Sequence, residues 1–292
     1  YKYAVGTDAQ GNIYVGATAF AAKLYVQYGG TGDFQLVGAE PLLTGQAIGW
    51  IRDIVVDGDG YIALASNTYG NKDDANSWQG GFSRWVLPGL FRHTPDVNAG
   101  WTRQAYPPVP TMADAPTAIV ADSGDNLYAT WGSYNTGVLY YYDGTANSWI
   151  QKANPDSGLV LTRLLWAGGK LYALGHMAGF VEEGSIVYRW RVACYDPSND
   201  TWSTLGEAPI PPYSGSSYND LVDIPMAIGL SWAWDGGDYI YMLRGDGTKS
   251  WARYATTTDI WEVLPDPAVD FTVSQGPAMV RVGGHFYVYA TP

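Results

Sequence analysis

Histidine, cysteine and lysine are scarce in this chain, and each shortage argues against a class of protein. Its 292 residues include three histidines and one cysteine. The histidines, His93, His176 and His285, stand far apart without a paired metal-ligand spacing, so no metal site and no cofactor are expected. Cys194 lies alone in an apolar run, which predicts a buried, unreactive thiol and excludes an intramolecular disulfide.

The shortage of basic residues gives the chain a strongly acidic balance. Its 16 lysines and arginines stand against 28 aspartates and glutamates, and the formal net charge is -12. Because a phosphate backbone would be repelled, neither a nucleic acid nor an anionic membrane is expected as a partner. No apolar run of about 18 residues is present, which argues against membrane insertion.

The remaining composition favours a location outside the cell. Lysine and glutamate are few, whereas tyrosine, tryptophan, threonine and glycine are abundant, as is typical of secreted and surface proteins. The tripeptide Asn199-Asp200-Thr201 is a glycosylation sequon in a predicted turn and agrees with that expectation. The chain shows no signal peptide, as expected of a mature product whose leader has been removed.

A short turn followed by an apolar strand with an early tyrosine recurs about every 50 residues. Such a period predicts a repeat protein in which each unit is one small sheet. The 36 glycines and 17 prolines suit many short strands joined by tight turns. The cassettes begin at Asp8, Asp57, Asp122, Gly168, Gly236 and Gly283.

Three of the repeats also contain a tyrosine and a tryptophan seven positions apart. A polar turn separates the two aromatics in each case, which predicts a third strand ending in tyrosine and a fourth strand opening with tryptophan. The tryptophan is then expected to cover the turn and pack between neighbouring sheets. The pairs are Tyr142 with Trp149, Tyr195 with Trp202, and Tyr254 with Trp261.

Through these two features the chain resembles the Kelch family of β-propellers. The clearest copy runs from Gly168-Gly169 through Tyr172 to Tyr195 and Trp202. The first three repeats depart from the pattern, since Asp and Gly turns replace Gly-Gly, and Phe34 and Trp101 replace the regular tryptophan. The resemblance implies a propeller fold but not one activity, because propellers serve many functions.

The predicted fold is therefore all-β: a six-bladed β-propeller of four-stranded antiparallel blades in a single domain, residues 1–292. The first five blades have four strands each, and the sixth has two, Ala278 to Val282 and Phe286 to Ala290. Three explanations are open: a naturally two-stranded blade, a strand pair taken from another molecule, or an incorrect strand count. The blades are placed at about 3–38, 51–106, 117–152, 162–206, 225–264 and 275–292.

The short last blade predicts an assembly edge. An apolar strand with unpaired backbone groups is a site that natural proteins normally protect or pair. The expected partner is another protein or an identical subunit, and a heterologous contact between identical subunits would give a ring or a filament. The edge strand consists of His285, Phe286, Tyr287, Val288, Tyr289 and Ala290.

Long loops are predicted mainly on one face, and they contain the candidate ligand-binding residues. The segments Asn67 to Gly81, Ala178 to Gly184, Ala105 to Pro116 and Gly206 to Pro225 share that face, and Pro88 to Gly100 is a long turn on the other. Aromatic rings beside amides could stack on a sugar ring, although they could equally pin the loops to the propeller. These rings belong to Tyr69, Trp78, Tyr106, Tyr213 and Tyr218.

No catalytic motif is specific enough to predict an enzyme. Copper radical oxidases of the galactose oxidase type need two histidines and two tyrosines on copper, and this chain offers only Cys194 beside Tyr195. Glu182-Glu183 is the best acid pair for a glycosidase, but a solvated loop explains it better. Asp8, Asp122 and the run Asp57 to Gly60 are expected to stabilise turns rather than bind calcium.

The expected function is therefore non-catalytic. The chain is predicted to be an extracellular binding or structural propeller, with self-assembly through completion of the last blade as one form. The alternative is a lectin-like polysaccharide-binding module, or a polysaccharide-active enzyme with acidic residues on the long-loop face.

Overall fold

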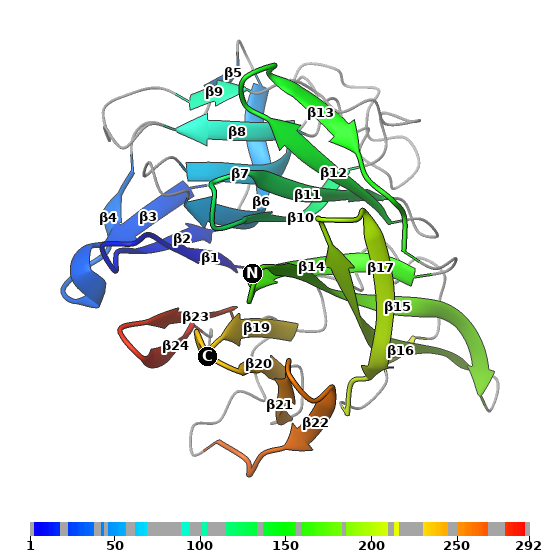
Figure 1. Ribbon diagram of the computed structural model, residues 1–292. Coiled ribbons are helices and arrows are strands. Elements are labelled where there is room, and N and C mark those ends of the chain that lie inside the picture. The colour runs from blue at the N-terminus through cyan, green and yellow to red at the C-terminus, as the bar shows by residue number, and fades with distance from the viewer. Residues whose placement is uncertain are drawn as a thin grey trace. The chain divides into compact units, whose positions relative to one another are not determined.

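The computed structural model describes residues 3–17, 23–37, 42–43, 46–56, 62–68, 89–93, 101–103, 115–132, 137–155, 159–182, 185–209, 213–215, 230–244, 250–267 and 278–289. Almost all of these residues lie in antiparallel strands or in the turns between them (Figure 1). The chain divides into an N-terminal unit, Tyr3–Ser133 with Leu139–Gln151, and a C-terminal unit made mainly of Lys152–Pro292. Within the described ranges, no helix is long and apolar enough to cross a membrane.

The N-terminal unit consists of sheets in which strands pair in chain order. The first strands of neighbouring sheets lie close together: a methyl group on Gly6 would meet Ile54 Cγ2 at 3.0 Å. The Ile119 backbone N–H donates to Asp53 Oδ2 at 3.0 Å. The strands are β1 (Tyr3–Thr7), β2 (Ile13–Ala17), β3 (Lys23–Gln27) and β4 (Gln35–Leu36); β5 (Leu42–Leu43), β6 (Gln46–Val56), β7 (Ile62–Thr68), β8 (Gly89–His93) and β9 (Trp101–Arg103); β10 (Ala115–Ala121), β11 (Leu127–Gly132), β12 (Val138–Asp143) and β13 (Ser148–Gln151).

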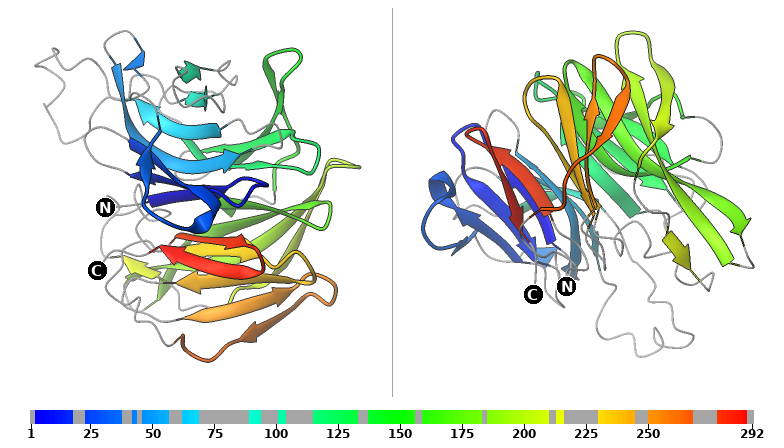
Figure 2. Two further views of the ribbon diagram at one scale, coloured as in Figure 1. Left: turned by 90° about the vertical axis from the view of Figure 1, so that its left-hand side faces the viewer. Right: turned by 90° about the horizontal axis from the view of Figure 1, so that it is seen from below.

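The C-terminal unit repeats this arrangement and ends in a two-stranded sheet. Both views in Figure 2 place the red hairpin of that sheet beside the yellow-to-orange strands that precede it. The Met279 backbone N–H donates to Ser231 Oγ at 2.7 Å, which joins the first strands of the last two sheets. The strands are β14 (Leu159–Ala167), β15 (Lys170–Glu182), β16 (Ser185–Asp196), β17 (Thr201–Glu207) and β18 (Tyr213–Gly215); β19 (Leu230–Trp234), β20 (Tyr239–Arg244), β21 (Trp251–Ala255) and β22 (Ile260–Val263); β23 (Ala278–Val282) and β24 (His285–Tyr289).

Aspartate side chains hold two of the turns between first and second strands. Asp8 Oδ1 accepts the backbone N–H groups of Gln10 and Asn12 at 3.0 and 2.8 Å. Asp122 Oδ1 accepts those of Gly124 and Asn126 at 2.8 and 3.0 Å. This is the Asx-turn chemistry expected of these positions. The run Asp57 to Gly60 lies outside the described residues.

The core of the C-terminal unit lies between the sheet β14–β17 and the sheet β19–β22. Side chains from both sheets form one apolar cluster that includes Tyr172, Trp190, Trp232, Met242 and Tyr254. Burial of apolar area on this scale contributes about 25 cal/mol per Å² removed from water. Aromatic packing between antiparallel sheets therefore holds the unit together.

Two loop predictions were wrong. Ala178 to Gly184 was expected to be a loop, but β15 continues to Glu182, with Phe180 opposite Val187 and Glu182 opposite Ser185. Apolar alternation in the returning strand extends the ladder up to Glu182 and Ser185. Pro88 to Gly100 was expected to be a loop as well, but Gly89–His93 is the strand β8, which pairs with β7 and β9.

A third prediction needs a smaller correction. The connection Gly206 to Pro225 includes the strand β18, whose residues pair with Ile186 to Tyr188 on the extended part of β16. The long hairpin of β15 and β16 creates this additional edge, which a connecting segment then covers. The protein is nevertheless an all-β β-propeller built from four-stranded antiparallel blades, as the repeats predicted.

Candidate functional site at the edge of the last sheet

The last sheet begins as the other sheets do but contains two strands. Gly283 and Gly284 form its turn at φ values of 55° and 84°, a left-handed conformation that favours glycine. Val282 then pairs with His285 and Ala278 with Tyr289. In the part of the chain that the structure describes, no strand pairs with the other side of β24. We call this side of His285–Tyr289 the acceptor edge.

One face of β24 anchors the strand to the preceding sheet. The Phe286 ring lies 4.7 Å from the Tyr241 ring and 6.3 Å from the Trp251 ring, measured between centroids. Val288 packs on a buried cluster that contains Leu243 and Met279. The edge strand is therefore held in place by aromatic and aliphatic contacts within the C-terminal unit.

Tyr287 distinguishes the acceptor edge from the same position in complete sheets. Tyr172 stands three residues after its glycine turn, as Tyr287 does, and is 5% exposed, whereas Tyr287 is 40% exposed. Tyr172 lies opposite Cys194 on the third strand, β16. Tyr128, on another second strand, is also buried. Tyr172 is covered by side chains of the sheet β19–β22, including Tyr254, whereas Tyr287 is exposed on the two-stranded sheet.

The predicted tyrosine and tryptophan pairs are confirmed in three sheets. The rings of Tyr142 and Trp149 have centroids 5.0 Å apart, and the other two pairs, Tyr195 with Trp202 and Tyr254 with Trp261, have centroids 5.2 Å apart. In each pair the two residues are direct cross-strand partners. Tilted rings at this separation stabilise a pair beyond the area they bury.

A third residue in this turn escaped the sequence analysis. Each tyrosine hydroxyl donates to a side-chain oxygen five residues later, on Asn147, Asp200 or Asp259, at 2.7 Å. These three residues have φ values of 47°, 54° and 57°. Asn and Asp tolerate this left-handed region better than other side chains do. Their recurrence five residues after the tyrosine and two before the tryptophan was the available signal. We call Tyr, Asn or Asp, and Trp in this spacing the hairpin triad.

Two of the triad tryptophans, Trp202 and Trp261, also touch a residue that comes four positions after the tryptophan of the preceding repeat. Trp202 Nε1 donates to the carbonyl of Ala153 at 2.7 Å, and Asp200 Oδ1 accepts the Ala153 N–H at 2.9 Å. Trp261 packs on Gly206, where an added methyl group would lie 3.9 Å from Trp261 Cδ1. Ala153 and Gly206 each follow their own sheet's tryptophan, Trp149 and Trp202, by four residues.

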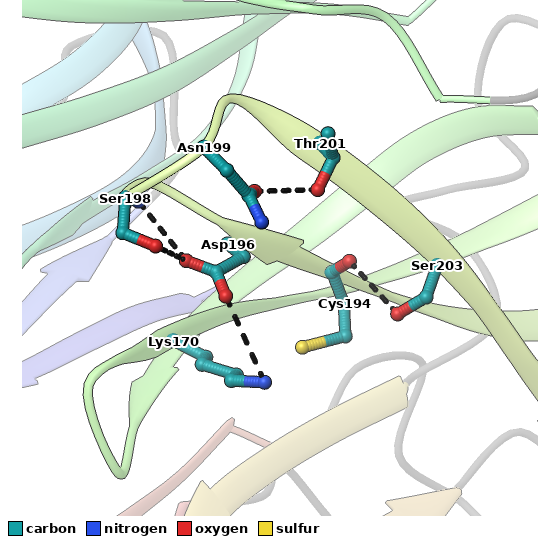
Figure 3. Close-up of polar contacts among 7 residues, drawn as sticks. All are labelled: Lys170, Cys194, Asp196, Ser198, Asn199, Thr201 and Ser203. Atoms are coloured by element: carbon teal, nitrogen blue, oxygen red, sulfur yellow. Dashed lines mark hydrogen bonds and ion pairs between the residues drawn. The ribbon is translucent and has the colours of Figure 1, made fainter.

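The turn around Cys194 is structural (Figure 3). Asp196 Oδ1 accepts the Ser198 N–H at 3.0 Å and its hydroxyl at 2.6 Å, and these bonds lower the Asp196 pKa. Lys170 Nζ lies 3.9 Å from Asp196 Oδ2. Cys194 is buried, as predicted, and burial raises the pKa of its thiol. Burial, with Cys194 nearby, raises the pKa of Tyr172 to about 12, so neither group is poised as a nucleophile near neutral pH.

Most of the predicted ligand-binding residues lie outside the described residues: Tyr69, Trp78, Tyr106 and Tyr218. Tyr213 begins β18 and pairs with Tyr188, but its side chain is outside the description. The same holds for Ala290 and for the side chain of Tyr289 on the acceptor edge. Among the described residues, no group of three or more His, Cys, Asp or Glu side chains could hold a metal ion. The glycan-binding surface therefore stays a prediction.

Comparisons with known proteins agree with the Kelch-like reading of these repeats. No family model matches the chain. The chain is similar to the F-box/kelch-repeat protein SKIP4 of Arabidopsis thaliana, with 26% identity over 226 residues, 73% of this chain and 55% of that protein. The match thus spans about half the length of this relative. The protein is a β-propeller with a distant kelch-repeat homologue, so the predicted resemblance is confirmed.

Two solved structures share the fold at low sequence identity. A protein of unknown function from Dyadobacter fermentans DSM 18053 superimposes with a TM-score of 0.63 and 13% identity, covering 99% of this chain and 90% of that one. Hydrazine synthase of Kuenenia stuttgartiensis gives a TM-score of 0.61 and 12% identity, covering 99% of this chain and 83% of that one. At these identities the likeness concerns the fold alone.

Proposed function

We propose that this protein is a non-catalytic, six-bladed propeller that binds a protein partner by accepting an additional strand along the acceptor edge. The observation that carries the proposal is the 40% exposure of Tyr287 on a strand that no described strand covers. Backbone groups on such an edge gain hydrogen bonds from an added strand, and alternate side chains provide specificity. An extracellular or cell-surface location belongs to the same proposal.

The side chains of the acceptor edge favour pairing over protection. Natural edge strands are commonly blunted by lysine, proline or an inward charge. The strand His285–Tyr289 contains no lysine, no proline and no acidic residue. An aromatic side chain on a cross-strand neighbour contributes roughly 0.2–1 kcal/mol relative to alanine. A partner strand would therefore gain both backbone bonds and contact with Tyr287.

The test uses the full chain and a labelled peptide with the sequence of residues 250–256, which copies the third strand of the preceding sheet. Fluorescence polarisation should show saturable binding. Tyr287→Lys should weaken it at least tenfold, because it puts a charge in the contact. Ile150→Lys is the matched control, since Ile150 is 45% exposed on the outer strand of a complete sheet. Absence of binding, or equal weakening by both variants, would overturn the proposal.

Self-assembly is a separate outcome that the same variants resolve. Light scattering of the purified chain over a concentration series reports its oligomeric state. Association that Tyr287→Lys abolishes and Ile150→Lys preserves would show that identical subunits occupy the acceptor edge. That result supports the edge as the functional site and replaces the foreign partner with a second copy.

A further inference from the structure

The structure assigns a more specific occupant to the acceptor edge: a β-hairpin from a partner protein that carries the hairpin triad. This inference rests on the proposed function and adds which kind of segment binds. Three independent features of the described residues specify the tyrosine, the second strand and the tryptophan of that hairpin.

The position of Phe286 specifies the tyrosine. Leu171 stands two residues after its glycine turn, as Phe286 does, and Tyr195 on the third strand lies opposite it. In the next sheet Ile240 likewise faces Tyr254. A strand that pairs with β24 in the same register places its own tyrosine opposite Phe286. The hydroxyl of that tyrosine then needs the acidic or amide acceptor that the triad supplies.

The neighbouring sheet specifies a second strand. Arg253 pairs with Tyr241 and Glu262 pairs with Arg253, so all three lie on the face that contacts Phe286. On this face, the outermost strand β22 exposes Ile260 to 60%. Arg253 Nη2 lies 2.7 Å from Glu262 Oε2 there, and its guanidinium stacks 4.3 Å from the Tyr239 ring centroid. A single strand added beside β24 would be the third strand of its sheet, as β21 is in the preceding sheet. A hairpin would also supply a fourth strand, as β22 does.

The ends of the preceding sheets specify the tryptophan. In two sheets, the residue four positions after the tryptophan receives the tryptophan of the following sheet, as Ala153 receives Trp202 and Gly206 receives Trp261. In the fifth repeat that position is Pro265, which is exposed. Its carbonyl oxygen can accept an indole N–H as that of Ala153 does. Pro265 is thus the exposed position of the preceding sheet that would receive the tryptophan of the hairpin.

The chain itself provides the probe. A peptide of residues 250–265 contains a complete triad, Tyr254, Asp259 and Trp261, on two strands with their native turn. We expect it to bind the full chain at least tenfold more tightly than the peptide of residues 250–256. Changing Trp261→Ala in the peptide should remove that gain, and Trp251→Ala, outside the triad, should preserve most of it.

The outcomes separate this inference from the proposed function. If both peptides bind equally, strand addition stands and the hairpin is wrong. If neither peptide binds, both proposals fail. In the protein, Tyr287→Lys should weaken both peptides, whereas Pro265→Asp should weaken only the hairpin, through a charge beside the indole. Equal effects of Pro265→Asp on both peptides would overturn the assignment of the tryptophan site. Circular dichroism and the thermal midpoint confirm that each variant is folded, and Tyr287→Thr provides a second edge variant without a charge.

Discussion

At the residue scale, the turn between third and fourth strands depends on one side chain with two tasks. Asp200 adopts a left-handed backbone conformation and accepts hydrogen bonds from the Tyr195 hydroxyl and the Ala153 N–H. Tyr195 is fully buried, so the loss of this acceptor leaves a buried hydroxyl unsatisfied.

Asp200→Ala should lower the free energy of unfolding by about 2 kcal/mol, from the backbone conformation and the lost acceptor together. Asp200→Asn is the control, because Asn147 performs both tasks in another sheet, and it should cost less than half as much. Urea denaturation followed by fluorescence measures both variants. Equal losses would show that charge, rather than conformation and acceptor geometry, is what the turn requires.

Buried phenols predict a loss of stability in alkali. Burial, and after it the neighbouring Cys194, raise the pKa of Tyr172 above its ordinary value to about 12. Because the folded-state pKa exceeds the unfolded one, this group stabilises the protein fully below about pH 10, and that contribution disappears as the pH rises toward 12. Burial also raises the pKa of Tyr254.

The urea midpoint should therefore fall steadily between pH 10 and about pH 12. Tyr172→Phe removes one ionisable group and should make that fall shallower, by at most about 2.7 kcal/mol for a shift of two pKa units. An identical pH profile for Tyr172→Phe and the parent chain would contradict the assignment.

At the element scale, close approach of strands limits which side chains the sheets accept. A methyl group on Gly175 in β15 would lie 2.7 Å from the carbonyl oxygen of Val160 and 2.8 Å from Leu159 Cδ1. Real Cβ atoms do not approach backbone so closely, so β14 or β15 would have to shift.

Gly175→Ala should destabilise the protein by about 1–3 kcal/mol, the usual cost of overpacking. Gly206→Ala is the matched control, since the nearest atom to its added methyl group is Trp261 Cδ1 at 3.9 Å, an ordinary contact. Its effect should stay within about 0.5 kcal/mol. Chemical denaturation of both variants decides the matter, and a neutral Gly175→Ala would show that the strands can separate freely.

At the scale of the whole molecule, the sheets are similar units that differ in how completely they are paired. Hydrogen exchange should report this difference, because amides open locally according to their pairing and burial. In the free chain, residues 285–289 should exchange faster than the second strands of four-stranded sheets, such as β20. Addition of the 250–265 peptide should slow exchange in 278–289 and leave β1–β4 unchanged. Uniform protection of β24 in the free chain would argue against an open acceptor edge.

Much of the repeat architecture could be predicted because its signals are local. Glycine turns, alternating apolar strands and the seven-residue spacing of Tyr195 and Trp202 each arise within a few residues of one another, and the structure pairs them as expected. The extended pairing of β15 and β16 was not predicted. Phe180 pairs with Val187 only because both strands are longer than the strands of the other repeats. The aromatic loop residues stay predictions, because they lie outside the described part of the chain.

The amino-acid sequence alone determined the class of fold, the turn chemistry of Asp8 and Asp122, and the aromatic pairs of three repeats, because periodicity and turn residues act over short stretches of chain. Only the tertiary structure decided which tyrosines are covered. Tyr172 and Tyr287 occupy the same place in their repeats, yet 5% of one and 40% of the other are exposed. That difference depends on which side chains of another sheet pack over the ring, as those of β19–β22 do over Tyr172. Such packing joins distant segments of the chain and is not set by the strand's own residues.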